Sequence, residues 1–196
     1  TTLIVKMLCL AGNKIASLDA AGIGVEMEAD KPGWCDSMNG LPGLCGSSTP
    51  EVFELKRQVV FIQDSIDKLG LDENYKASLP EEIYGFLKNI EILIKEKGAD
   101  FSYWDKANSV KEEYRQNIKS GFNGVERVLS AKELKEMLGV FLIKINDAVK
   151  KAYDHGKKAY ATYFINEVTE YELLNKLDPI KGLNLVKPTA FKSIRL

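Results

Sequence analysis

The side chains best suited to chemistry lie between residues 22 and 48. This stretch holds six of the 15 glycines and two of the six prolines, so tight turns rather than a regular hydrogen-bond ladder must shape its backbone. Carboxylates beside an aromatic ring and an amide are the groups that bind and cleave sugars. So long a loop is uncommon in a compact domain, which favours a site over the alternative of a solvated surface loop. The candidate side chains are Glu26, Glu28, Asp30, Lys31, Trp34, Asp36 and Asn39.

The start of this stretch has the period of a β-strand. Apolar and polar residues alternate from Ile23 to Asp30, which predicts an extended segment near 23–29. On such a strand Glu26 and Glu28 share a face, roughly 6.5–7 Å apart, and both can point into one pocket. The alternative is that both carboxylates simply face water on an edge strand.

A second extended segment is expected near 159–171, where aromatic and β-branched residues concentrate. Strict alternation would place Glu167 on one face between Tyr163 and Tyr171, which would be substrate-binding neighbours. Aromatic neighbours and partial desolvation raise the pKa of a carboxyl group, as a general acid or base requires. Glu167 is therefore a further candidate catalytic residue. The tail from residue 177 onward, which contains two prolines, is expected to be irregular.

Most of the remaining chain has the period of amphipathic helices. Three S-x-x-E capping boxes, at 48–51, 78–81 and 130–133, each precede an apolar stripe with steps of three and four residues. An apolar run over 3–11, followed by Gly and Asn, predicts a further short helix with a left-handed cap. Because such stripes are core positions, a single helical domain over 1–196 is expected.

Composition excludes several classes of protein. With 45% hydrophobic and 28% charged residues in 196, the chain has globular proportions and enough length for one core. A net charge of -1 provides no basic surface for nucleic acid. The sequence has three cysteines without a close pair and a single histidine, which argues against structural zinc and against a secreted disulfide framework. The acidic loop lacks the spacing of an EF-hand. No metal is therefore expected. No apolar run reaches membrane-spanning length, and a cytoplasmic location is expected.

Residues 34–39, Trp-Cys-Asp-Ser-Met-Asn, resemble the W-N-D-G-M-N signature of cellobiose-phosphorylase-like proteins, whose catalytic domain is an (α/α)6 toroid. The flanking Pro32-Gly33 and Gly40-Leu-Pro-Gly43 resemble a variant in a divergent branch of that family, and residues 163–169 resemble a toroid segment near the sugar site. The sequence departs from the family in two respects. Gly33 stands where the family has an acid, and no Arg/His/Thr cluster for phosphate is recognisable.

The resemblance implies a mainly α fold, part of an (α/α)6-toroid-like domain, that cleaves or phosphorolyses glycosidic bonds in an oligosaccharide or glycoside. Asp36 maps onto the family's general acid, and Trp34 and Asn39 onto its subsite residues. Either Glu28 or Glu167 would then activate water for hydrolysis, whereas inorganic phosphate as co-substrate would need no protein base. A toroid needs more helices than this chain contains, so a fragment is expected, with the rest of its own polypeptide as its partner. The alternative is a non-catalytic helical module that binds sugar or protein.

Overall fold

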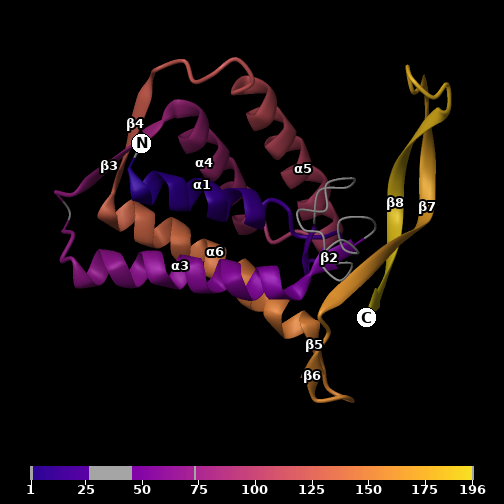
Figure 1. Cartoon of the computed structure of the whole chain (residues 1–196), viewed down its shortest axis with the longest axis horizontal. Helices are drawn as coiled ribbons and strands as arrows, with labels where there is room; N and C mark the ends of the chain where they lie inside the picture. Colours follow the sequence, from indigo (N-terminus) through magenta and orange to yellow (C-terminus); the bar gives the residue numbers. More distant parts are fainter. Residues whose placement is uncertain (1, 27–45, 73, 196) are drawn as a thin grey trace, which may run out of the picture.

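A computed structural model of the chain describes residues 2–26, 46–72 and 74–195 (Figure 1). These residues form five helices, with 51% of the structure helical and 27% in strands. The prediction of a mainly α, toroid-like domain is therefore wrong. A helical body carries a curled four-stranded antiparallel sheet, and the fold is a mixture of helices and sheet.

The helices of the body are α1 (Leu3–Ile15), α3 (Thr49–Lys68), α4 (Glu81–Lys95), α5 (Asp100–Asn117) and α6 (Ala131–Ala152). The four-stranded sheet has the order β1 (Val25–Glu26), β2 (Gly46–Ser48), β7 (Tyr163–Leu177) and β8 (Asn184–Arg195). Two further antiparallel pairs are β3 (Lys76–Pro80) with β4 (Glu126–Ser130), and β5 (Tyr153–Asp154) with β6 (Ala159–Tyr160). Of the helices in the described ranges, none has the length and apolarity that crossing a membrane requires.

The hydrophobic core lies between α1, α3, α4 and α6. Helix α3 packs against α6 and α1, and α4 packs against α5, α6 and α1 (Figure 1). The apolar stripes predicted from the sequence face this core, since Leu55, Leu87 and Phe141 are all fully buried. Their burial is the main stabilising term, at roughly 25 cal/mol for each Å² of apolar surface removed from water.

Helix α1 continues past its predicted end. Gly12 lies inside the helix, where an added Cβ would come within 2.5 Å of Leu87 Cδ2 and 3.1 Å of Phe86 Cε1. This glycine therefore allows α1 and α4 to approach each other closely and does not form a left-handed cap. The helix ends at Ile15.

One of the three predicted capping boxes forms in full. At the start of α6, Ser130 Oγ accepts a hydrogen bond from Glu133 N, while Glu133 Oε2 accepts one from Ser130 N. Ser48 precedes α3 but makes no side-chain cap hydrogen bond. Ser78 belongs to β3, because pairing with β4 continues as far as Pro80, and α4 begins after that residue.

The largest departure from the expected fold is the β7–β8 arm, which we define as residues 163–195. Strand β7 extends the predicted segment to Leu177, and β8 occupies the tail for which the sequence predicts no regular structure. Pro188 is accommodated because β8 is an edge strand of the sheet. Figure 1 shows the two strands extending side by side away from the helices.

Candidate functional site

The structure describes the two ends of the 22–48 stretch. Strands β1 and β2 pair there, with Val25 opposite Ser48 and Glu26 opposite Ser47, and β2 pairs in turn with the start of β7. The two ends of the loop and the base of the arm therefore belong to one sheet. The remaining candidates of this stretch lie outside the described residues: Glu28, Asp30, Lys31, Trp34, Asp36 and Asn39.

Asp19 holds the two ends of the loop together. Its fully buried carboxylate accepts hydrogen bonds from the backbone N–H of Ile23 at 2.8 Å and of Gly24 at 3.2 Å. It also accepts bonds from Ser47 Oγ at 2.5 Å and from Asn166 Nδ2 at 3.5 Å. One side chain thus ties the turn before β1 to β2 and to β7, which fixes the geometry at the base of the loop.

Glu26 is the described carboxyl group whose surroundings are best suited to proton transfer. The indole of Trp104, in α5, donates a hydrogen bond from Nε1 to Glu26 Oε1 at 2.9 Å. Burial raises the pKa of Glu26 to about 7, and the negative charge of Asp19 acts in the same direction. The Trp104 hydrogen bond and the positive charge of Lys111 oppose this rise. A carboxyl group with a pKa near 7 can both accept and release a proton at neutral pH.

Aromatic rings from α5 and β8 surround the indole that holds Glu26. The ring of Phe191 meets Trp104 edge-on, with centroids 5.2 Å apart. The ring of Phe101 lies 5.6 Å from the indole and 6.0 Å from Phe191. These contacts leave Trp104 partly buried and place the base of the arm against α5.

Strand β7 does not bring Glu167 to this cluster. Consecutive strand residues point to opposite faces, so Glu167 lies on the face opposite Asn166, whose amide reaches Asp19. The Glu167 side chain is exposed, and Lys192 lies opposite it on β8.

The two tyrosines predicted beside Glu167 lie at different places along the arm. Tyr163 is half-buried at the start of β7, where it pairs with Ser48 of β2. Tyr171 lies beyond a register shift that follows Val168, and its side chain is 60% exposed. The shift interrupts the alternation that would place Glu167 between Tyr163 and Tyr171 on one face.

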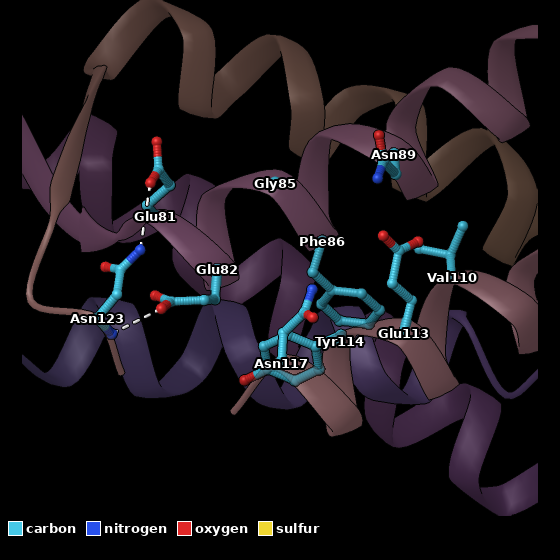
Figure 2. A pocket seen from close by; sticks show the side chains of 10 residues that line it. All are labelled: Glu81, Glu82, Gly85, Phe86, Asn89, Val110, Glu113, Tyr114, Asn117 and Asn123. Carbon is cyan, nitrogen blue, oxygen red and sulfur yellow. Dashed lines mark hydrogen bonds between the residues drawn. The ribbon is translucent and has the colours of Figure 1, made fainter. Parts of the chain in front are cut away.

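A separate groove of about 460 Å³ lies between α4 and α5, and Figure 2 shows the residues that line it. At one end Asn123 donates hydrogen bonds from its backbone N to Glu82 Oε1 at 2.8 Å and from its side chain to Glu81 Oε2 at 3.4 Å. The other carboxylate oxygen of Glu82 is buried and has no hydrogen-bond partner among the described residues. Phe86 and Tyr114 stack on each other along the groove, with centroids 4.6 Å apart. Carboxylates, amides and an aromatic floor could hold a polyhydroxyl ligand.

Sequence reasoning missed Asp19 and Trp104. An aspartate followed by two nearby glycines is the local signal for Asp19, because this pattern is typical of a turn stabilised by its own side chain. Trp104 is separated from Glu26 by 78 positions and lies on a helix with weak apolar periodicity, so nothing in the sequence connects the two.

No protein-family model matches the chain, and no curated protein matches it. The resemblance to cellobiose-phosphorylase-like proteins therefore stays a prediction based on residues 32–43 and 163–169. Within residues 2–26, 46–72 and 74–195, no group of three or more His, Cys, Asp or Glu side chains could hold a metal ion.

Proposed function

We propose that this chain contributes to the active site of an enzyme that cleaves glycosidic bonds in an oligosaccharide or glycoside. The observation that carries the proposal is Glu26, a carboxyl group with a pKa of about 7 held by an indole at the edge of a long Gly/Pro-rich loop. The sequence of that loop supplies the remaining chemistry. Its motif at 34–39 resembles the sugar-site signature of a family of glycoside-processing enzymes.

In the proposed mechanism two carboxyl groups divide the proton transfers. Asp36 donates its proton to the glycosidic oxygen as the bond to the anomeric carbon breaks. A water molecule attacks that carbon from the opposite side and transfers a proton to ionised Glu26, which gives hydrolysis with inversion. Glu28 and Glu167 stay proposed alternatives for this base. With inorganic phosphate as the attacking group, no protein base is needed and Glu26 would become a binding residue.

The proposed sugar contacts come from the same loop and from the arm. Trp34 offers an apolar ring on which a sugar can stack, and Asn39 and Lys31 offer hydrogen bonds to its hydroxyl groups. Tyr163 and Tyr171 are kept as outer contacts. We propose the cytoplasm as the compartment, because the cysteine pattern does not indicate a disulfide framework.

The decisive experiment is Glu26→Gln in the full-length protein. Glutamine keeps an oxygen that accepts the Trp104 hydrogen bond but cannot accept a proton from water. Hydrolysis should fall by about 10²–10⁴-fold, the usual contribution of general acid–base catalysis, while sugar binding is retained. In the unmodified protein the rate should rise with pH through about 7 as Glu26 loses its proton. The matched control is Glu172→Gln, which changes an exposed glutamate on the arm. Equal turnover in the two variants would refute the role of Glu26.

The same pKa gives the direction of the pH dependence of stability. Between pH 4.5 and about 7 the unfolded chain has lost the Glu26 proton while the folded protein keeps it. The folded state then binds more protons, so the free energy of unfolding falls as pH rises through this window. Partial exposure limits the fall to about 2 kcal/mol. Urea unfolding at pH 5 and pH 8 should show this fall in the unmodified protein and not in Glu26→Gln.

A non-catalytic sugar-binding module is the second candidate function, and the groove between α4 and α5 favours it. The groove combines the buried carboxylate oxygen of Glu82, three amides and an aromatic floor without any of the predicted catalytic residues. Sugar binding that survives Glu26→Gln but is lost in Glu82→Ala, with no bond cleavage by the unmodified protein, would identify this second function.

A further inference from the structure

A basic pocket of about 580 Å³ lies between the end of α4, the start of α5 and the second half of α6. Lys97, Lys144, Lys150 and Lys151 line it, together with Asp100 and Asp147. The pocket therefore carries an excess of two positive charges in a chain whose net charge is -1. Such a local excess inside a hollow attracts anions.

Two of the lysines are neutralised within the protein. Asp100 accepts hydrogen bonds from Lys144 Nζ at 2.7 Å and from Lys151 Nζ at 2.6 Å. Lys151 also pairs with Asp147 at 2.5 Å. These ion pairs lower the pKa of Asp100, in spite of its partial burial, and raise the pKa of Lys151, so both groups are charged at neutral pH. They form a fixed wall that links α5 to α6.

The other two lysines supply the unbalanced charge. Lys97 and Lys150 are exposed, and neither makes an ion pair within the described part of the chain. Helix α5 also begins at this pocket without a side-chain cap, so the positive end of its dipole adds to the charge of the two lysines. Ile94 and Tyr103 form an apolar part of the wall.

We propose that this pocket binds the phosphoryl group of a small anion, with Lys97 and Lys150 as the residues that contact it. Lysine ammonium groups act as point charges for phosphate oxygens. The volume falls in the range of pockets for small organic ligands and exceeds the needs of a bare phosphate ion, so a small phosphorylated molecule is the expected form. The inference is independent of glycosidic cleavage, because it uses none of the residues assigned to that reaction.

Calorimetric titration of the 196-residue chain with inorganic phosphate and, separately, with glucose 6-phosphate tests the proposal. The double variant Lys97→Gln/Lys150→Gln should bind at least about tenfold more weakly, because it removes two charge-assisted hydrogen bonds. Lys132→Gln/Lys176→Gln, which removes two exposed lysines outside the pocket, is the matched control and should bind within about twofold of the unmodified chain.

The two ligands distinguish the sources of the phosphoryl group. Tighter binding of glucose 6-phosphate identifies a phosphorylated molecule, and equal binding identifies free phosphate as sufficient. Far-UV circular dichroism of both double variants checks that the fold is retained. Absence of saturable binding by both anions at 10 mM, or equal loss of binding in the pocket variant and in the control, overturns the proposal.

Discussion

Large apolar side chains are buried in the helical body but exposed on the β7–β8 arm. In the body, Leu134 and Phe141 of α6 have no exposed surface. On the arm, Leu177 is 62% exposed and Ile180, at the turn between the strands, is 91% exposed. Other large apolar side chains exposed along the arm are Val168, Tyr171, Leu173, Leu174, Leu183, Leu185, Val186 and Ile194.

The difference shows that apolar content alone does not bury a segment. A helix with one apolar stripe is buried as soon as a second helix covers that stripe. A two-stranded ribbon has two faces and needs a further layer on each of them, which the described residues do not provide beyond the base of the arm. The arm is held at that base, where Phe164 is buried and β7 pairs with β2.

The largest expected contrast between the two regions is in the cost of shortening an apolar side chain. Phe141→Ala should lower the free energy of unfolding by about 3–5 kcal/mol, because it leaves a cavity in the core. Leu177→Ala on the arm should change it by less than about 0.5 kcal/mol, because water already surrounds this side chain. Urea unfolding followed by circular dichroism measures both. Similar costs for the two changes would mean that the arm is packed as tightly as the body.

A smaller contrast is expected between two aspartates that each accept backbone hydrogen bonds. Asp19→Ala should cost about 3 kcal/mol, because buried donors at the loop base lose their acceptor. Asp178 also accepts backbone hydrogen bonds, in the turn of the arm, from Ile180 N at 2.9 Å and from Lys181 N at 2.6 Å. Asp178→Ala should cost less than about 1 kcal/mol, since water can replace the exposed acceptor. Thermal unfolding of the two variants side by side gives the comparison, which fails if Asp178→Ala is the more damaging change.

The smallest expected effect concerns the contact between arm and body. Phe191→Ala removes the ring that meets Trp104 and Phe101, at a cost of about 1–2 kcal/mol. Hydrogen exchange of the β8 amides should become faster, because the base of the arm loses its contact with α5. Tyr171→Ala, farther along the arm, is the control and should leave β8 exchange unchanged. Unchanged exchange in Phe191→Ala would place the attachment of the arm at β2 alone.

The sequence predicts the helical body well and the arm poorly. Stripes with steps of three and four residues are local signals, and they place α3, α4 and α6 close to their observed positions. The extended segment near 159–171 is also predicted, but its partner β8 contains Pro188 and follows a turn with Gly182, which favour irregular structure. Strand pairing depends on which segment lies alongside, and the local pattern does not specify it.

The candidate site likewise has a part that the sequence predicts and a part that it does not. The cluster of acidic residues in the loop marks Glu26 as a candidate site residue. The other polar candidates adjacent to it in the sequence are predicted from the same cluster. The raised pKa of Glu26 comes mainly from burial, and no local signal pairs the loop with Trp104 and Lys111, the two α5 groups that partly oppose the rise. Folding, rather than sequence proximity, gives Glu26 its raised pKa.

The hydrogen bond between Asp19 and Asn166 joins residues 147 positions apart, and it also has a consequence in time. Closing a chain segment of this length costs conformational entropy before the contact can form, so we expect this contact to be made late in folding. During synthesis the segments of α1 and α3 leave the ribosome long before β7 does. The helices can therefore begin to pack before β7 is available to pair with β2 at the end of the 22–48 stretch.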